Sequence, residues 1–150
     1  MIILENKFEL KKIKDKVVSE LKNYPNLDAK IESIALDILE AEENIKIAGS
    51  SFNSIHSTAN NNSTVESDVL RIIDTVNRLK CEKIRLENKK KKMDLALSVL
   101  DDDHKKMVQM HYFQKKSWVE VGMSIQRGAD YCTKVFKNKI CGQIGNILFN

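Results

Sequence analysis

The stretch LSVLDDDHKKMVQMHYFQKKSWVEVGMSIQRGADYCTKVFKNKI, residues 97–140, decides the fold expected for this chain. Its apolar residues recur every three or four positions in three short runs, which predicts three short helices. Ser117 precedes the second run and Glu120 lies three residues later, so the pair predicts a capping box at the start of that helix. Gln126-Arg127-Gly128 ends it, and Gly128 is expected to supply the backbone freedom for a sharp turn. The pattern indicates a helix-turn-helix with one supporting helix before it.

The third helix of this stretch is predicted to divide into an apolar and a polar face. The apolar positions are Cys132, Val135, Phe136 and Ile140. The polar face carries lysines and an asparagine, which suit the major groove because lysine meets phosphate or guanine and asparagine pairs with adenine. The DNA-binding residues predicted from the stretch are Lys115, Lys116, Arg127, Asp130, Tyr131, Thr133, Lys134, Lys137 and Asn138.

Several of these positions have more than one interpretation. Lys115 and Lys116 precede the first helix of the motif and are expected to touch backbone phosphate. Tyr131 fits contact with a base or phosphate as well as packing within the head. Asp130 lies in a first helical turn, where the helix dipole favours an acid, and its carboxylate could also accept from N4 of cytosine. We interpret Trp118 as a core anchor rather than a base-stacking residue.

No motif in the chain indicates catalysis or a bound cofactor. A phosphate-binding glycine loop and an HExxH motif are both missing. His104 and His111 lie seven residues apart on one predicted helix, and we interpret them as a partly exposed and a packed histidine rather than a metal site or a general base. Cys81, Cys132 and Cys141 form no CxxC pair, which favours reduced thiols in a cytoplasmic protein over a zinc site. We therefore predict a protein that is not an enzyme and has no catalytic residue, metal or cofactor.

Composition predicts an all-α chain of one domain or two small ones. The 150 residues are 42% hydrophobic and 31% charged, and one proline and five glycines favour long uninterrupted helices. Period-two alternation, the sign of strands, is nearly absent. No apolar run approaches the length of a membrane span, and the first residues are too short in apolar length for a secretory signal.

The net charge of +4 is unevenly distributed. Residues 78–92 hold eight lysines and arginines against two glutamates, residues 101–150 hold eight against five acids, and residues 23–64 have a net charge of −4. Localised basic regions are expected where parts of a chain touch an anionic partner. The run Lys89-Lys90-Lys91-Lys92 fits contact with the DNA backbone and a solvated helix face equally well.

Three longer helices are predicted before the helix-turn-helix, over residues 3–22, 27–48 and 65–100. Tyr24-Pro25-Asn26 ends the first, because the residue before proline is pushed out of the α region. Apolar residues of the second and third helices repeat at alternate spacings of four and three, which is a coiled-coil pattern. Joined by a flexible loop at 49–64, these two helices are expected to form an antiparallel hairpin whose open side the first helix can cover.

The details of these helices give further expectations. Lys83 and Lys90 interrupt the apolar repeat, which predicts either a frayed middle or irregular packing that depends on a partner. Thr64 is expected to cap the third long helix, and Asp101 or Asp102 the helix after it. Residues 141–149 either extend the last helix or fold back. The predicted first-helix face is Leu4, Phe8, Ile13, Val17 and Leu21, and the predicted domains are a helical coiled-coil domain at 1–100 and a helix-turn-helix domain at 101–150.

Three segments together resemble one protein family. They are NYPNLDAKIESI at 23–34, STVESDVLRIID at 63–74 after the Ser- and Asn-rich loop, and the tail at 97–140. The chain resembles the ArpU/RinA-type phage and prophage transcriptional regulators of Gram-positive bacteria, and its tail also resembles region four of bacterial sigma factors. Gly122 stands where that family usually has alanine, and we expect the difference to be tolerated because both residues are small at the contact between the helices. The resemblance implies activation of late phage genes through contact with RNA polymerase.

We therefore expect sequence-specific binding of double-stranded DNA by a transcription regulator of phage or prophage origin, acting as an activator. One alternative is a DNA-packaging recognition subunit like a small terminase, which pairs a DNA-binding head with oligomerising helices. Another is a protein-interaction module that binds polymerase or a sigma factor through its coiled coil. Double-stranded DNA is the expected partner, RNA polymerase and a second copy of the chain are further candidates, and no membrane is involved.

Overall fold

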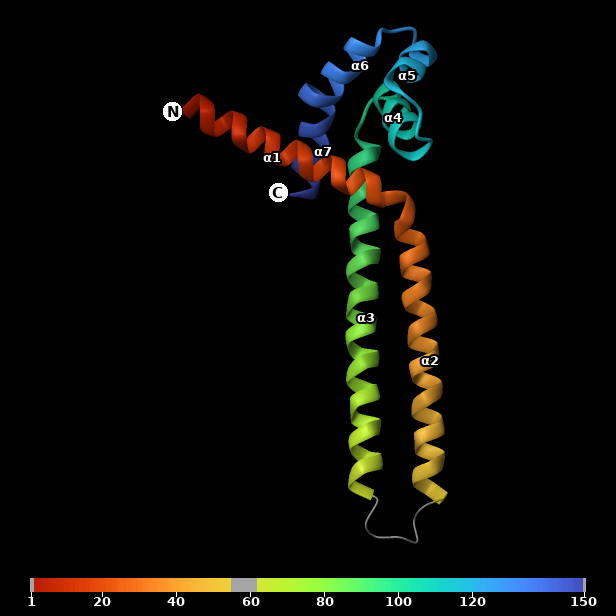
Figure 1. The fold of residues 1–150 in the computed structure, drawn as a ribbon. Helices are drawn as coiled ribbons and strands as arrows, with labels where there is room; N and C mark the ends of the chain where they lie inside the picture. Colours follow the sequence, from red (N-terminus) through yellow and green to blue (C-terminus); the bar gives the residue numbers. More distant parts are fainter. Residues whose placement is uncertain (1, 55–61, 150) are drawn as a thin grey trace. The chain divides into compact units, whose positions relative to one another are not determined.

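The computed structural model describes residues 2–54 and 62–149, and every regular element in these ranges is helical, which confirms the all-α class (Figure 1). Residues 24–26 form a 3₁₀ turn, and η2 and η3 are π-helical turns. The elements are α1 (Ile2–Asn23), η1 (Tyr24–Asn26), α2 (Leu27–Ser54), α3 (Asn62–Ser98), α4 (Asp102–Val108), η2 (Gln109–Phe113), α5 (Trp118–Ile125), α6 (Ala129–Val135), η3 (Phe136–Ile140) and α7 (Cys141–Leu148).

The chain divides into two compact units that do not follow the boundary expected at residue 100. The hairpin comprises residues 27–88, and the head combines residues 1–26 with residues 89–150. The division differs because α1 packs against α7 and η2, and because the last turns of α3 bring Met93 and Ala96 into the core of the head. The expectation that the first helix covers the hairpin is therefore wrong: α1 belongs to the head.

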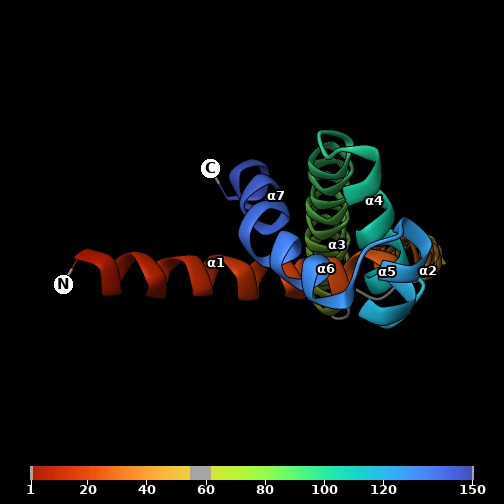
Figure 2. The ribbon, with the colours of Figure 1, turned by 90° about the horizontal axis from the view of Figure 1, so that it is seen from above.

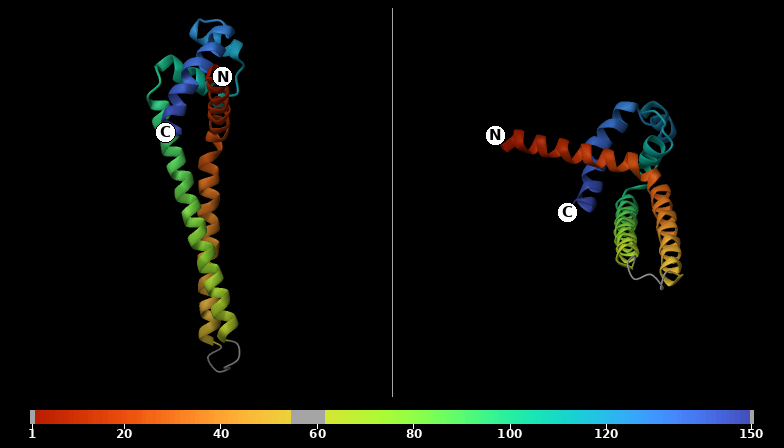
Figure 3. Two further views of the ribbon diagram at one scale, coloured as in Figure 1. Left: turned by 90° about the vertical axis from the view of Figure 1, so that its left-hand side faces the viewer. Right: turned by 60° about the horizontal axis from the view of Figure 1, so that its bottom comes forward.

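In the hairpin, α2 and the first part of α3 lie side by side and antiparallel (Figures 1 and 3). The predicted apolar repeat faces inward: Leu27, Ile38, Val76 and Leu86 are buried, and the other described apolar members of the repeat are partly buried. α3 is continuous through Lys83, whose ammonium lies 3.6 Å from the carboxylate of Glu87. The frayed middle that this lysine suggested is not observed, because a long lysine stem can lie along the repeat with its charge at the edge.

The ends of the hairpin helices differ from the prediction. α2 continues to Ser54 and α3 begins at Asn62, so the connection is shorter than the expected loop at 49–64. Thr64 lies inside α3 and does not cap it. Residues 55–61, the middle of that expected loop, lie outside the described residues.

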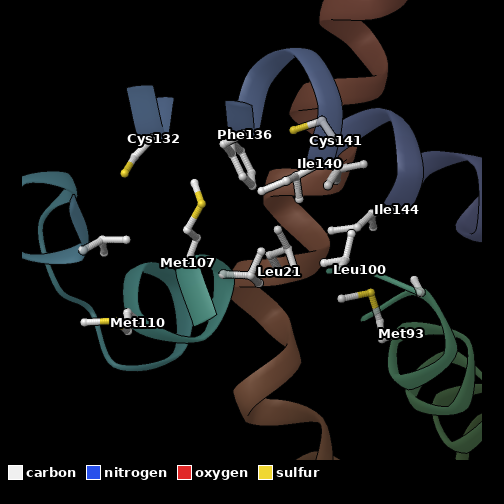
Figure 4. Close-up of a cluster of buried hydrophobic side chains, with 14 residues drawn as sticks. Leu21, Met93, Leu100, Met107, Met110, Cys132, Phe136, Ile140, Cys141 and Ile144 are labelled. Carbon is white, nitrogen blue, oxygen red and sulfur yellow. The ribbon is translucent and has the colours of Figure 1, made fainter. Parts of the chain in front are cut away.

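The core of the head gathers side chains from five segments of the chain (Figure 4). Val17 and Leu21 of α1 are fully buried, and Ile13 packs against the same cluster. Phe8 was expected on this face but is 68% exposed, because the first half of α1 runs beyond α7 (Figure 2). The side chain of Leu4 lies outside the described residues. The buried residues of the core are Val17, Leu21, Met93, Ala96, Leu100, Met107, Val108, Met110, Val121, Cys132, Phe136, Ile140, Cys141 and Ile144.

Candidate nucleic-acid interface

The capping box predicted at the start of α5 is confirmed. The amide of Glu120 donates to Ser117 Oγ at 3.2 Å, and the amide of Ser117 donates to Glu120 Oε2 at 3.3 Å. Two amides that the first helical turn leaves unpaired are thereby satisfied. The helix-turn-helix therefore begins at a fixed residue, and Val121 of α5 is fully buried.

The turn between α5 and α6 uses different residues from those expected. Gln126 adopts the left-handed conformation with φ 59°, whereas Gly128 is extended, with φ −73° and ψ 157°. Gly128 is thus the N-cap of α6, and a side chain there would meet nothing within 4 Å. The expected role of Gly128 in reversing the chain is wrong, because the reversal occurs two residues earlier.

Gly122 is the glycine that this turn requires. The amide of Arg127 donates to the carbonyl oxygen of Gly122 at 2.8 Å, which brings the turn directly over α5. A Cβ atom at position 122 would lie 2.4 Å from the carbonyl oxygen of Arg127 and 3.3 Å from the carbonyl carbon of Gly128. Real Cβ atoms do not approach backbone this closely. The expected interchange with alanine is therefore not accommodated in this chain without a shift of the turn.

Aromatic rings pack α5 against η2, which continues the supporting helix α4. The ring of His111 stacks on Trp118 with centroids 3.8 Å apart, and Trp118 lies 5.5 Å from Phe136. The ring of His111 is fixed by a 2.8 Å hydrogen bond from Nδ1 to the carbonyl oxygen of Lys116. Burial lowers the pKa of His111, while the carbonyl of Lys116, which favours the charged ring, opposes the shift. Trp118 is therefore a packing anchor, as expected.

Of the two histidines, His111 is packed as expected, since its ring stacks on Trp118, whereas His104 is buried rather than partly exposed. His104 is buried, and its Nδ1 lies 3.8 Å from Asp101 Oδ2 without a hydrogen bond from any described residue. His111 is only half-buried. The interpretation of His104 as the more exposed ring fails because α4 begins at Asp102, after the N-cap Asp101, and turns His104 into the head.

The helix after the turn runs from α6 through η3 into α7, so residues 141–148 extend it rather than fold back. The amide of Cys141 donates to the carbonyl of Phe136, five residues earlier, which adds one residue to that turn. Cys132 is buried before the π turn, Phe136 and Ile140 are buried at its first and last positions, and Ile144 is buried after it. The extra residue rotates the later turns and keeps their apolar side chains on one face.

The predicted DNA-reading face is exposed along this helix. Cys132, Phe136 and Ile140 point into the core, as predicted, and Val135 packs against it. Thr133 donates its hydroxyl to the carbonyl oxygen of Ala129 at 2.8 Å, which leaves its methyl group outermost. The exposed residues of α6 and η3 are Asp130, Tyr131, Thr133, Lys134, Lys137, Asn138 and Lys139.

Lys139 is also exposed, although helical spacing did not predict it on this face. A regular α-helix would place position 139 on the stripe of Cys132 and Phe136, seven and three residues earlier. The π turn moves it outward beside Lys137 and Asn138. Within the ranges that the structure describes, Lys134, Lys137 and Lys139 form no ion pair with an acidic side chain, so their charges remain available to an anion.

Arg127 and Tyr131 form a pair of their own. The guanidinium lies over the tyrosine ring at 5.0 Å from its centroid, in cation–π geometry. Both line a pocket of about 390 Å³ together with Lys139 and the aspartates at the start of α4. Because those acids repel phosphate, Lys134 and Lys137, which do not line the pocket, are better placed than Arg127, Tyr131 and Lys139 for contact with a phosphate backbone.

Lys115 and Lys116 lie in the short connection before α5 and are exposed. Lys115 has the left-handed φ of 57°, and the amide of Lys116 donates to the carbonyl of Met110 at 2.9 Å. The backbone of this connection is thereby held, and both lysine side chains are left to solvent. Among the described residues, no hydrogen bond or ion pair joins them to the exposed face of α6.

Other ligand classes find little support in the described part of the chain. Among residues 2–54 and 62–149, no three His, Cys, Asp or Glu side chains are grouped so that they could hold a metal ion. Cys132 and Cys141 are buried free thiols, and Cys81 is an exposed one. None of the described helices is long and apolar enough to cross a membrane.

Comparison with known proteins gives one match. A family described as "Protein of unknown function (DUF722)" matches residues 13–141. These residues include the whole hairpin and most of the head. No curated protein and no solved structure matches the chain.

Proposed function

The chain belongs to the DUF722 family of proteins of unknown function, and from the geometry of its head we propose that it is a sequence-specific DNA-binding regulator of transcription. The observation that carries this proposal is the exposed face of the second helix of the helix-turn-helix. Lys134, Lys137 and Lys139 are unpaired there among the described residues, and Asn138 stands between two of them. Such a face offers phosphate contacts together with an amide that can pair with adenine.

The rigidity of the head supports this function. Direct readout needs side chains held in a fixed position against base edges. The capping box, the Gly122 turn and the stacked rings of His111 and Trp118 hold α5, and the buried side chains of Cys132 and Phe136 hold α6. The readout face therefore projects from a packed core.

The biological setting remains part of the proposal. The resemblance to ArpU/RinA-type regulators favours a cytoplasmic phage or prophage protein that activates late genes, with RNA polymerase as a second partner. A DNA-packaging subunit would use the same head, but it would bind few sites and show little preference for promoters. Genomic binding data separate these two functions.

The first experiment is selection of genomic fragments by the purified full-length chain at two salt concentrations, followed by sequencing. One enriched motif that survives the higher salt supports a sequence-specific protein, because backbone attraction alone weakens steeply with salt. Location of that motif near late promoters favours a regulator over a packaging subunit. Diffuse enrichment that disappears at the higher salt would contradict the proposal.

Variants then test the face itself. Lys134→Ala and Lys137→Ala should each lower the slope of log affinity against log salt by about 1 if the lysine meets a phosphate. Lys30→Ala is the matched control, because it removes the same charge from an exposed position in the hairpin. Fluorescence anisotropy with a labelled duplex measures all three. An unchanged slope in both head variants would remove the assignment of this helix.

A further inference from the structure

The two long sides of the hairpin differ in chemistry. On each helix, the residue that follows an inward-facing position lies about 100° further round the helix. On α3 these following positions include Leu70, Ile73 and Ile84, and on α2 they include Leu39. All four are large apolar side chains that solvent reaches. We call these four residues the apolar flank.

The four residues of the apolar flank lie on the same side of the hairpin. The two helices of the hairpin run in opposite directions. A step of one residue toward the C-terminus, taken from an inward-facing position, therefore leads to the same side of the hairpin on both helices. The structure shows this directly. Glu42 and Lys80 both occupy such following positions, and their charged groups lie 3.4 Å apart across the two helices.

The opposite side of the hairpin is polar. The positions that precede inward-facing residues include Asp37 and Glu40 on α2 and Arg71 and Arg78 on α3, and all four are exposed. Ile47 is the exposed large apolar residue on this side among the residues whose side chains are described. The polar side of the hairpin therefore suits contact with water, whereas the exposed side chains of the apolar flank do not.

The inward-facing residues of the hairpin are themselves incompletely covered. Ile31, Ile34 and Ile45 of α2 and Ile72 and Leu79 of α3 belong to the apolar repeat, yet each is only partly buried. Two helices cover only part of each other's apolar surface, whereas four helices close a core. A second pair of helices on the apolar flank would bury these residues further.

We propose that a second copy of this chain docks on the apolar flank, so that two hairpins form a four-helix bundle. Charge selects this occupant and its orientation. Residues 34–44 of α2 have a net charge of −4 and lie level with residues 78–88 of α3, which hold four basic and two acidic side chains, whereas residues 62–88 of α3 taken together are neutral. A second hairpin that set α2 against α2 would oppose two acidic segments. One that sets α2 of each copy against α3 of the other places each acidic segment beside a basic segment.

This arrangement fixes which residues meet. The symmetry axis runs parallel to the helices, so both hairpins keep the same height. Glu42 lies level with Lys80, so Leu39, three residues earlier, lies level with Lys83 and Ile84. Leu39 of one copy therefore faces Ile84 of the other, and each dimer contains this contact twice.

Sedimentation of the full-length chain without nucleic acid tests the proposal, which makes its outcome independent of DNA binding. The wild type should be dimeric at micromolar concentration. Ile84→Lys should raise the dissociation constant at least about tenfold, because two charges per dimer replace buried apolar surface. Ile47→Lys is the matched control: this isoleucine is 63% exposed, against 56% for Ile84, but lies on the polar side, so its variant should dimerise as the wild type does.

Both isoleucines are exposed in the hairpin, so circular dichroism should show unchanged helix content in both variants. A wild type that stays monomeric to about 100 μM, which corresponds to a dissociation constant weaker than that concentration, would overturn the proposal. Equal weakening by Ile47→Lys and Ile84→Lys would also overturn it, because the flank would then have no special part.

Cysteine cross-linking tests the orientation. In a Cys81→Ser background, Leu39→Cys and Ile84→Cys chains of different mass are mixed and oxidised. The proposed arrangement predicts a mixed disulfide between position 39 of one copy and position 84 of the other. Disulfides that join only position 39 to position 39 would show α2 against α2 and contradict the charge argument.

Discussion

Replacing Gly122 with alanine tests how tightly the turn of the helix-turn-helix packs on α5. The added methyl group would lie 2.4 Å from the carbonyl oxygen of Arg127. Its other close neighbours are also backbone atoms, at Gly128 and Ala129, so no side chain can swing aside to relieve the contact. The turn itself has to move, and that movement stretches the 2.8 Å hydrogen bond from the Arg127 amide to Gly122.

The expected cost follows from two opposing effects. Overpacking costs about 1–3 kcal/mol, and a contact of 2.4 Å with immobile backbone belongs in the upper part of that range, at about 2–3 kcal/mol. Alanine recovers about 0.8–1 kcal/mol of helix propensity over glycine, so we expect a net loss of about 1–2 kcal/mol. Gly142 is the matched control, because it lies in α7 with nothing within 4 Å of an added Cβ. Gly142→Ala should therefore stabilise the head by about 0.5–1 kcal/mol.

Urea unfolding followed by tryptophan fluorescence measures both variants. Trp118 is the one tryptophan of the chain and lies in the head, so the signal reports the head separately from the hairpin. With an m value of about 2 kcal/mol per molar urea, in the middle of the usual range, Gly122→Ala should lower the midpoint by about 0.5–1 M. A midpoint raised as in Gly142→Ala would refute the reasoning, because it would mean that the turn has room for a side chain.

Three further predictions concern single groups in the head. Ser117→Ala removes the side-chain half of the capping box and should lower the free energy of unfolding by about 1 kcal/mol. Ser124→Ala, at an exposed position of the same helix, should change it by only about 0.3 kcal/mol, and urea titration compares the two variants. Burial lowers the pKa of His111, so on acidification the unfolded chain takes up this proton before the folded chain does, and the stability of the head should fall as the pH drops below 6.5. His111→Gln should reduce the slope of the unfolding free energy against pH, measured from unfolding curves between pH 7 and 5. Burial raises the pKa of Cys141 from 9.0 to about 11, so the unfolded chain loses its proton first, and stability should fall as the pH rises above 9; Cys141→Ala should flatten that part of the profile.

Local patterns of the sequence were sufficient for much of this structure. The capping box of Ser117 and Glu120 follows from two residues three positions apart, and the hairpin follows from apolar spacing along α2 and α3. The inward and outward residues of α6 also follow from helical spacing. In each case the cause lies within a few helical turns, and local chemistry sets the result.

The remaining features depend on packing and backbone geometry that residue spacing does not show. Nothing near Ile13 or Val17 in the sequence shows that α1 packs on α7, where Gly145 lets the helices approach until an added Cβ would lie 2.8 Å from Ile13 Cγ2. The left-handed residue of the turn is Gln126 rather than the neighbouring Gly128, because the close contact with Gly122 determines where the chain reverses. Lys139 was missed for a related reason, since spacing rules assume an unbroken α-helix.

The π turn at η3 also determines how many polar residues the exposed face of α6 and η3 can hold. It holds one residue more than an α-helical turn, and its exposed members are Lys137, Asn138 and Lys139. Deletion of one of these residues would leave an ordinary helix, in which Ile140 and Ile144 keep the same side as Phe136. The head therefore has a point where a one-residue insertion or deletion alters the polar surface and leaves the core in register. DUF722 chains that differ by one residue here are expected to share the fold of the head and to differ in the polar side chains that this helix exposes.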